Sequence, residues 1–155
     1  MATSAPLSMP GFEGFEGVEL LQKLPLFKTL TFDETRRLFA VARTEKRAKG
    51  DVVIQENELG GALYIVKSGS LRVLADGKEV NRVGAGELLG EMSLVDELLT
   101  SARVEVVEDA ELLVLPRREF EALMTSDLAL QVKVYRAFCR TLSERLRRAN
   151  QAAIR

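Results

Sequence analysis

A glycine-rich stretch in the middle of the chain holds the residues best suited to binding chemistry. It runs from Gly84 to Asp96 and reads Gly-Ala-Gly-Glu-Leu-Leu-Gly-Glu-Met-Ser-Leu-Val-Asp. Glycine lets the backbone turn tightly or approach a ligand closely. A short helix is expected to begin near Glu91, and free N–H groups at a helix start favour an anion. The stretch predicts an anion-binding loop. Many glycine-rich loops bind nothing, so the rest of the sequence is needed to judge whether this one binds a ligand.

The composition excludes most catalytic chemistry. The chain has no histidine and a single cysteine, Cys139. Histidine metal sites, Ser-His-Asp and Cys-His nucleophile pairs and thiolate zinc clusters are therefore excluded. Cupin-type enzymes share a β-roll shape but generally need histidine ligands. A carboxylate metal site or carboxylate-pair hydrolase passes this filter, but no arrangement of acids argues for either. We expect no catalytic residue, no metal ligand and no enzyme activity.

Length and charge indicate one globular domain in the cytoplasm. The chain has 155 residues, of which 46% are hydrophobic and 29% charged, and its net charge is −1. It contains no apolar run near the roughly 18 residues of a membrane span. Its start lacks a basic region followed by an apolar core, so we expect no secretory signal. A lone cysteine forms no internal disulfide, which favours a reducing compartment.

The chain begins with an expected flexible tail over residues 1–17, rich in Pro, Ser and Gly. Residues 11–17 repeat Gly-Phe-Glu, either as a partner-binding motif or as a tail whose phenylalanines pack loosely on the domain. A domain is expected over residues 18–155. It opens with a helical pattern over 18–24 that ends at Pro25 and a second helix capped by Thr31 or Asp33.

Turn signals and short apolar runs predict a β-rich centre. Asp76-Gly77 is a strong hairpin signal, because a type I′ turn needs positive φ at both central residues. Many short strands about ten residues apart indicate an antiparallel sandwich or barrel. We predict a mainly β fold with flanking helices: an antiparallel, jelly-roll-like β-roll with short N-terminal helices and a long C-terminal helix. The six predicted strands cover residues 51–54, 62–66, 70–74, 79–83, 101–107 and 111–115.

Helical spacing returns after Pro116, with a short helix over 117–124 and a long one over 127–153 that Asp127 caps. The long helix would be roughly 40 Å long and overhang a small β domain. Either it folds back over its own domain, or its later members meet a second copy or another protein. We expect the members through Cys139 to pack on the domain. Leu142, Leu146, Ala149 and Ala153 are the predicted partner interface. Apolar or small residues recur at alternating spacings of four and three, as in a coiled-coil seam: Leu128, Val132, Tyr135, Cys139, Leu142, Leu146, Ala149 and Ala153.

The order of these pieces resembles the cyclic nucleotide-binding domain of catabolite-activator regulators and protein kinase A regulatory subunits. The resemblance covers about residues 18–150, and the joint order of its motifs is highly specific. The motifs that carry it are Leu24-Pro25-Leu26-Phe27, Lys49-Gly50-Asp51-Val52-Val53-Ile54, Gly60-Gly61-Ala62-Leu63-Tyr64-Ile65-Val66, Ser68-Gly69-Ser70-Leu71-Arg72-Val73, Gly90-Glu91-Met92-Ser93-Leu94, Ala110-Glu111-Leu112-Leu113-Val114-Leu115 and Phe120-Glu121-Ala122-Leu123.

The resemblance implies a ligand, cAMP or cGMP, and residues that hold it. Gly90-Glu91-Met92-Ser93 would be the phosphate-binding cassette. Glu91 would accept a hydrogen bond from the ribose 2′-hydroxyl, a charge-assisted bond that suits a carboxylate. The backbone amides around Met92 and Ser93 would face the cyclic phosphate. Alternatively, Glu91 only caps its own short helix.

The chain departs from the family where the phosphate arginine is expected. The usual Pro-Arg is replaced by Leu99 and Thr100, followed by Ser101. A charge-assisted contact to phosphate contributes roughly 1.5–3 kcal/mol, which is roughly tenfold to a few hundredfold in affinity. Arg103 does not replace it, because side chains on a strand alternate faces and Arg103 would point away from Thr100.

Other features near the expected phosphate also differ from a ligand-binding loop. Four acids, Glu87, Glu91, Asp96 and Glu97, are expected to cluster there and to repel an anion. Leu98 and Leu99 either fill the pocket or face a partner. Asn57 stands where the family commonly has glycine, and asparagine tolerates the left-handed conformation.

Two functions follow for this chain. The favoured one is a non-enzymatic regulatory module with weakened or lost cyclic nucleotide binding that acts through protein partners or self-dimerisation. The alternative is a functional cAMP or cGMP sensor that repositions its C-terminal helix, with Leu128 to Cys139 on the β-roll and Leu142 to Ala153 on a partner. Catabolite activators continue into a helix-turn-helix, whereas this sequence ends at Arg155. We expect no sequence-specific DNA binding, and we expect the six C-terminal arginines to form a solvated face.

Overall fold

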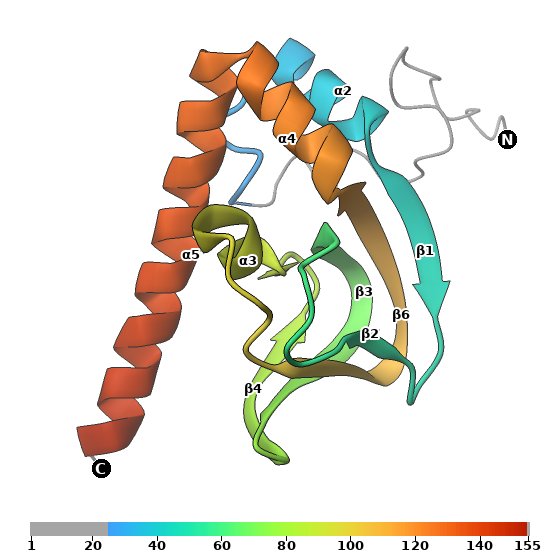
Figure 1. The fold of residues 1–155 in the computed structure, drawn as a ribbon, viewed down its shortest axis with the longest axis vertical. Coiled ribbons are helices and arrows are strands. Elements are labelled where there is room, and N and C mark those ends of the chain that lie inside the picture. The colour runs from blue at the N-terminus through green and yellow to red at the C-terminus, as the bar shows by residue number, and fades with distance from the viewer. Residues whose placement is uncertain (1–24, 155) are drawn as a thin grey trace, which may run out of the picture.

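The computed structural model describes residues 25–154, and the predicted tail and first helix lie outside them. The helices and strands confirm the predicted fold class, an antiparallel β-roll flanked by helices (Figure 1). No helix within residues 25–154 is long and apolar enough to cross a membrane. The elements are α2 (Phe32–Ala40), β1 (Arg43–Arg47), β2 (Val52–Ile54), β3 (Ala62–Ala75), β4 (Lys78–Gly84), β5 (Leu88–Leu89), α3 (Glu91–Asp96), β6 (Arg103–Pro116), α4 (Arg117–Ser126) and α5 (Leu128–Ile154).

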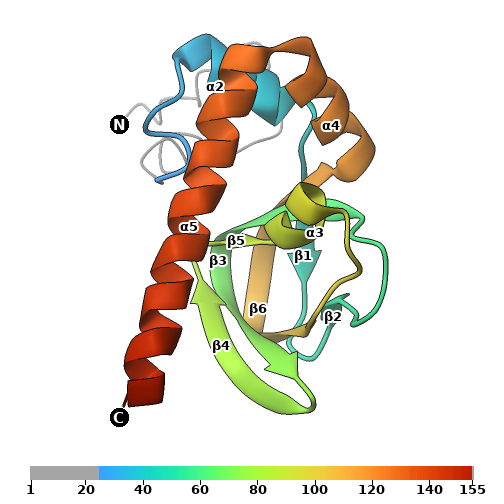
Figure 2. The same cartoon turned by 60° about the vertical axis from the view of Figure 1, so that its left-hand side comes forward.

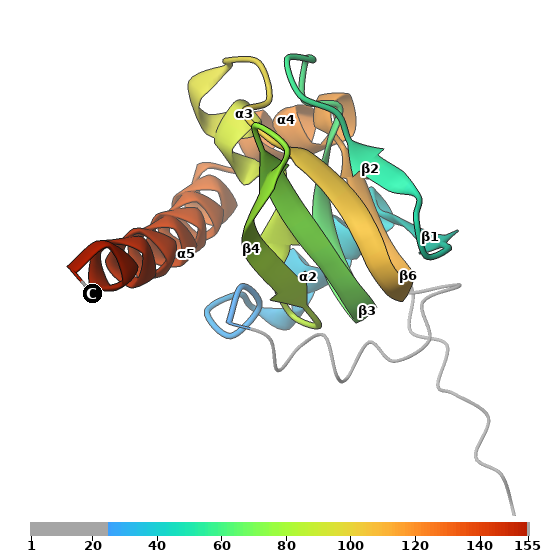
Figure 3. The same cartoon turned by 90° about the horizontal axis from the view of Figure 1, so that it is seen from below.

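Two long strands form the centre of the sheet. Strands β3 and β6 pair with each other, with β1 beyond β6 and β4 beyond β3, and every pairing is antiparallel. Strand β2 also pairs with β6, and β5 pairs with β3. The strands curl into a roll when seen from below (Figure 3). The cassette helix α3 follows β5 directly, so the sheet fixes where the cassette begins.

The sequence predicted β3 and β6 as two strands each, and this was wrong. The break expected between the predicted strands 62–66 and 70–74 is an irregularity inside one strand, with register shifts on both sides of Ser68. Gly69 has φ +88°, and a Cβ there would lie 2.4 Å from the carbonyl oxygen of Asp109 on β6. Only glycine allows this close approach, so β3 bends and continues instead of ending.

Local signals placed the other elements well, but the strands β1 and β5 were not predicted. The turn between β3 and β4 has positive φ at both Asp76 and Gly77, as the hairpin signal predicted. Thr31 caps α2 through a reciprocal capping box with Glu34. Strand β1 was not predicted, because its sequence Arg-Thr-Glu-Lys-Arg has no apolar pattern and its pairing with β6 alone makes it a strand.

Both faces of the sheet are buried. One face packs against the helices and holds the larger cluster, which includes Phe39, Leu63, Phe120 and Phe138. The other face lies inside the roll and holds a second cluster around Val66, Leu71 and Leu112. Because β3 contributes to both clusters, the roll and the helical layer are joined through one strand.

Helix α5 runs the length of the molecule beside α3 and the sheet (Figures 1 and 2). Its buried residues are Leu130, Val134, Ala137 and Phe138. The prediction that the seam residues through Cys139 pack on the domain was therefore wrong in part: Tyr135 packs against the core cluster, but Leu128, Val132 and Cys139 are exposed. Successive helix residues rotate by about 100°, which puts the seam about a third of a turn from the packed face.

The later part of α5 does not overhang its own domain. Arg145, Arg148, Ala149 and Ala152 line a cavity together with Val80 and Asn81 of β4. Of the predicted partner interface, Leu142 is half-buried, while Leu146, Ala149 and Ala153 are exposed. One face of α5 thus follows its own domain, and most seam residues, among them Leu128, Val132 and Leu146, form an exposed stripe along another face.

Replacement of Gly69 by alanine should destabilise the fold strongly. Gly69→Ala adds a Cβ that collides with β6 and holds a non-glycine residue at positive φ, so we expect a loss of about 2 kcal/mol or more in the free energy of unfolding. Urea unfolding measures it. Gly61→Ala is the control, because a Cβ at Gly61 meets nothing within 4 Å. Equal stability of the two variants would contradict this account of the bend.

Candidate functional site

The residues predicted for the cassette line one cavity of about 240 Å³ between the roll and α5. Gly90, Glu91, Met92 and Ser93 reach it from the start of α3, and Thr100 and Ser101 from the segment before β6. The apolar wall comes from Ile54, Val73, Val80, Leu89, Ala102 and Val104. The structure therefore brings the six predicted site residues together, while their roles toward a ligand stay predictions.

Two close backbone approaches set the position of the cassette. Gly90 precedes α3 with φ +85°, and a Cβ there would lie 2.6 Å from the carbonyl oxygen of Ala62. A Cβ on Gly60 would lie 2.6 Å from the Cβ of Ser93. Side chains at either glycine would push α3 away from the roll, so these glycines serve packing as well as any ligand.

An arginine outside the predicted site holds the cassette from the side of α4. Arg117 donates from Nη1 to the carbonyl oxygen of Gly60 at 3.1 Å and from Nη2 to that of Ser93 at 3.3 Å. Its Nε donates to Glu121 at 2.9 Å. Because Arg117 does not line the 240 Å³ cavity, it positions the cassette and does not substitute for the missing phosphate arginine.

The predicted ribose-binding carboxylate already has a cationic partner. Glu91 is 1% exposed, and its Oε1 accepts a hydrogen bond from Nη1 of Arg145 on α5. Nη2 of Arg145 donates to the carbonyl oxygen of Leu88. Burial raises the pKa of Glu91 above its ordinary value, and the charge of Arg145 acts in the opposite direction. The guanidinium therefore supplies the charge that this buried carboxylate needs.

Thr100 uses its hydroxyl to hold a neighbouring loop. Its Oγ1 donates to the carbonyl oxygen of Gln55 and accepts from the backbone N–H of Glu58 at 3.0 Å. Two backbone bonds reinforce this contact, from Asn57 N to Thr100 O and from Thr100 N to Glu58 O, both 2.8 Å. The side chain that stands in the arginine position is thus engaged with the 55–58 backbone and 8% exposed.

The expectations for Arg103 and Asn57 are confirmed. Arg103 is exposed and pairs through Nη2 with Glu105 at 2.7 Å, whereas its neighbours Ala102 and Val104 line the cavity. Asn57 has φ +59°, the left-handed conformation expected for it. Among the described residues, Arg145 is the one cation that lines the cavity.

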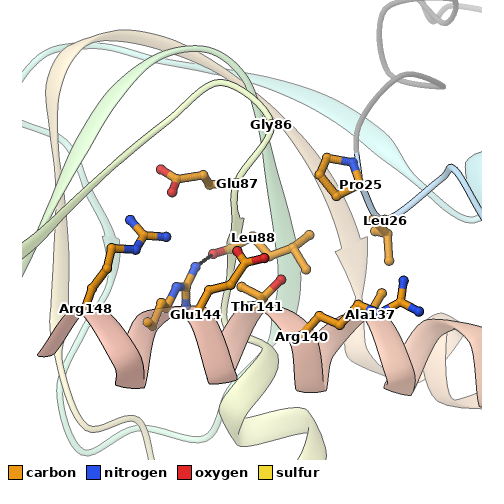
Figure 4. A pocket seen from close by; sticks show the side chains of 11 residues that line it. Pro25, Leu26, Gly86, Glu87, Leu88, Ala137, Arg140, Thr141, Glu144 and Arg148 are labelled. Carbon is orange, nitrogen blue, oxygen red and sulfur yellow. Dashed lines mark hydrogen bonds between the residues drawn. The ribbon is translucent and has the colours of Figure 1, made fainter. Parts of the chain in front are cut away.

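The predicted acidic cluster is wrong in part. Glu91 lines the cavity, but Asp96 and Glu97 lie on exposed backbone outside its lining. Glu87 lines a separate cavity of about 130 Å³ between α5 and the turn at Gly86, where Figure 4 shows it across from Arg148. With Glu91 paired to Arg145, the cavity is far less acidic than the sequence suggested.

Leu98 and Leu99 do not fill the pocket. They are 65% and 54% exposed and, with Val95, form an apolar surface beside α3. The sequence allowed these leucines either to fill the pocket or to face a partner, and in the structure they are exposed to solvent. Within residues 25–154 no group of three or more acidic or cysteine side chains is placed to hold a metal ion.

Comparison with known proteins decides the family. The family model described as the cyclic nucleotide-binding domain matches residues 44–127. The chain belongs to this family. The match includes the roll, the cassette and Thr100, and stops at the residue before α5. The domain is therefore a regulatory module of the cyclic nucleotide-binding type, as the resemblance predicted.

Relatives and solved structures agree with this assignment. The cyclic AMP receptor protein of Thermus thermophilus is 38% identical over 105 residues, which is 64% of this chain and 49% of the relative. The crystal structure of the Thermus thermophilus catabolite activator protein is similar with a TM-score of 0.68 and 36% identity, over 83% of this chain and 61% of that one. The domain spans between about a tenth and about half of the first curated relatives.

A third similar structure is the regulatory subunit of a cAMP-independent protein kinase A from Trypanosoma brucei. Its TM-score is 0.70 and its identity 25%, over 80% of this chain and 43% of that one. The fold is thus found in a protein described as cAMP-independent as well as in a cyclic AMP receptor.

Sequence reasoning missed Arg145 as a site residue. It was counted among the six C-terminal arginines and read as part of a solvated face. A signal was present: Arg145 is 11 residues after Val134 and 15 after Leu130, on the packed face when each residue adds about 100°. That spacing predicts only the side of α5 on which Arg145 lies; its contact with Glu91, 54 residues earlier, depends on the tertiary fold.

Removal of the Thr100 hydroxyl should cost stability. Thr100→Val keeps the shape but leaves the carbonyl oxygen of Gln55 and the N–H of Glu58 without this partner, so we expect a loss of about 1–3 kcal/mol in the free energy of unfolding. Thr100→Ser is the matched control and should stay close to the wild type. A valine variant as stable as the wild type would show that the hydroxyl has no structural role.

Proposed function

We propose that this domain is a non-enzymatic, cytoplasmic regulatory module that binds cAMP and cGMP weakly or not at all and acts through protein surfaces. It keeps the roll and the cassette of its family. The alternative, a cyclic nucleotide sensor that repositions α5, remains the second candidate because Gly90, Glu91, Met92 and Ser93 still line one cavity.

The observation that carries the proposal is the engagement of Thr100. A cyclic phosphate at this position would meet a hydroxyl already bonded to Gln55 and Glu58 instead of a bidentate cation. Arg145 lines the same cavity, but its guanidinium is bonded to Glu91 and Leu88. A ligand anion would therefore find no unpaired positive side chain among the described lining residues.

The comparisons support the proposal without deciding it. The Trypanosoma brucei relative is described as a regulatory subunit of a cAMP-independent kinase. Loss of cyclic nucleotide dependence is therefore compatible with the fold and with a regulatory role. The absence of histidine and the single cysteine support a role without catalysis.

Calorimetric titration measures whether the lack of an arginine at position 100 weakens nucleotide binding. We expect the wild type to show no binding of cAMP or cGMP at micromolar concentrations, and Thr100→Arg to bind at least tenfold more tightly because it restores a charge-assisted phosphate contact. Thr125→Arg, which adds the same charge at an exposed position of α4, should leave the wild-type result unchanged.

Micromolar binding by the wild type would contradict the proposal and favour the sensor. If neither the wild type nor Thr100→Arg shows detectable binding, features of the cavity other than the missing arginine also prevent nucleotide binding. Because Thr100→Arg also removes the bonds to Gln55 and Glu58, its thermal unfolding has to be recorded in the same experiment.

We further propose that the exposed stripe of α5 is the surface through which the module pairs with a second copy. Apolar or small side chains follow the heptad spacing of a coiled-coil seam along this face. Leu128, Val132 and Leu146 are each more than half exposed, which is unusual for large apolar side chains in a row. Leu128, Val132 and Leu146 lie away from the packed face of α5, whereas Tyr135 and Leu142 are half-buried and Ala149 borders a cavity beside β4.

Sedimentation of stripe variants measures this pairing. Leu142→Asp and Leu146→Asp should convert a dimer to a monomer, because each puts a charge into the seam. Gln151→Asp adds the same charge on the same helix outside the stripe and should leave the mass unchanged. If the wild type is monomeric, or if both leucine variants keep the wild-type mass, the seam is not an interface.

A further inference from the structure

Seven of the eleven exposed large apolar side chains within residues 25–154 gather on two surfaces. Three of the seven belong to the stripe of α5. The other four lie on α3 and in the segment that follows it: Met92, Val95, Leu98 and Leu99. Apolar side chains that gather on a surface, unlike scattered ones, indicate an interaction site. The second surface has no role in the fold or in the pairing through α5 described above.

The 95–99 segment, Val-Asp-Glu-Leu-Leu, is held in an outward conformation. All five of its residues are exposed. Glu97 ends α3 with φ +59°, and it is the one described residue other than Gly, Asn or Asp at positive φ. A glutamate rarely adopts this conformation, and backbone strain of this kind often accompanies a function. At the other end, the bonds of Thr100 to Asn57 and Glu58 fix the position of the segment.

The exposed part of α5 carries arginines without ion-pair partners. Outside α5, eight of the nine described arginines form an ion pair, whereas only Arg145 does so among the five on α5. Arg136, Arg140 and Arg147 fall within about 40° of one another, because each helix residue adds about 100°. This arginine row lies about a third of a turn from the stripe and from the packed face. Since Glu144 is the one acid of α5, the row gives the exposed helix surface a positive charge beside its apolar stripe.

The 95–99 segment is complementary to this helix surface. Asp96 and Glu97 form no ion pair among the described residues, and Oδ1 of Asp96 accepts only the backbone N–H of Leu98, at 3.0 Å. The segment therefore combines apolar side chains with two unpaired carboxylates, and α5 combines apolar side chains with unpaired guanidinium groups. Opposite charges beside apolar contacts select a partner and fix its register. Because the two sets of charges do not pair within one copy, a second copy can satisfy them.

The segment and the stripe are neighbours on one surface of the domain. Helix α3 lies beside the middle of α5 (Figure 1), and Glu91 at its start bonds to that helix. Burial raises the pKa of Tyr135, a stripe residue, and the carboxylates of Glu121 and Glu97 act in the same direction, so Glu97 lies near the stripe. A surface that holds both elements can meet its own copy around a two-fold axis, with each segment against the other helix.

We propose that the 95–99 segment of one copy docks on α5 of a second copy, with its apolar side chains on the stripe and with Asp96 and Glu97 facing the arginine row. The second copy docks its own segment in return, so the contact closes as a dimer and does not extend into a fibre. This inference rests on the proposed pairing through α5 and adds to it a second contact, which sets the charge pattern that a partner has to match.

Sedimentation of charge-reversed full chains tests the docking. Asp96→Lys/Glu97→Lys and Arg140→Glu/Arg147→Glu should each weaken the dimer at least about tenfold, because like charges then face each other at both contacts. An equimolar mixture of the two variants should form a heterodimer with nearly the wild-type affinity, because opposite charges meet again at both contacts. All four positions are exposed, so each variant should keep the melting temperature of the wild type.

Glu108→Lys/Glu119→Lys is the matched control, because it makes the same change in net charge as the lysine pair at exposed positions outside the 95–99 segment. It should dimerise like the wild type. Unchanged dimerisation of both charge-reversed variants, or a mixture that stays monomeric, would overturn the docking. In that case a monomeric Leu142→Asp would still support pairing through the stripe alone. A monomeric wild type would overturn the pairing and the docking together.

Discussion

The bond between Arg145 and Glu91 determines how the site of this domain is arranged. A carboxylate that is 1% exposed needs a partner, because an unpaired buried charge is strongly destabilising. The partner comes from α5, 54 residues later in the chain. This one contact joins the second half of α5 to the cassette and pairs the charge of Glu91, the residue that the resemblance assigns to the ribose. Helix α5 therefore forms part of the cavity, because Arg145 lines it.

Thr100, which stands where the resemblance leads us to expect an arginine, fits the same arrangement. Its hydroxyl binds the 55–58 backbone from inside the cavity wall, so the wall is closed where a phosphate cation is expected. Arg117 holds the cassette from the opposite side through the carbonyl oxygens of Gly60 and Ser93. The cassette is thus held by protein contacts from α4 and from α5. Such fixation suits a module that presents constant surfaces to partners.

Much of the fold could be predicted from the sequence because its signals are local. The Asp76-Gly77 turn, the Thr31 cap and the Asp127 cap each depend on residues within a few positions, and each is present. The cassette residues could be predicted to meet because their order matches a family. What could not be predicted depends on distant pairs. Strand β1 forms because it pairs with β6. Glycine is needed at position 69 because the carbonyl oxygen of Asp109 lies so close. Glu91 forms its ion pair with Arg145, which is 54 residues later in the chain. The early heptad members Leu128, Val132 and Cys139 were expected on the domain and are exposed, because the packed face of α5 lies about a third of a turn away.

The central claim is that Arg145 is held in the cassette of the wild-type domain, and NMR of arginine side chains tests it most directly. Resonances of the Arg145 guanidinium, assigned with Arg145→Lys, should show slowed rotation and slowed proton exchange of the η groups, and should stay unchanged when millimolar cAMP is added. Averaged η signals like those of the exposed arginines would contradict the account, because the carboxylate would then be available to a ligand and α5 free to move.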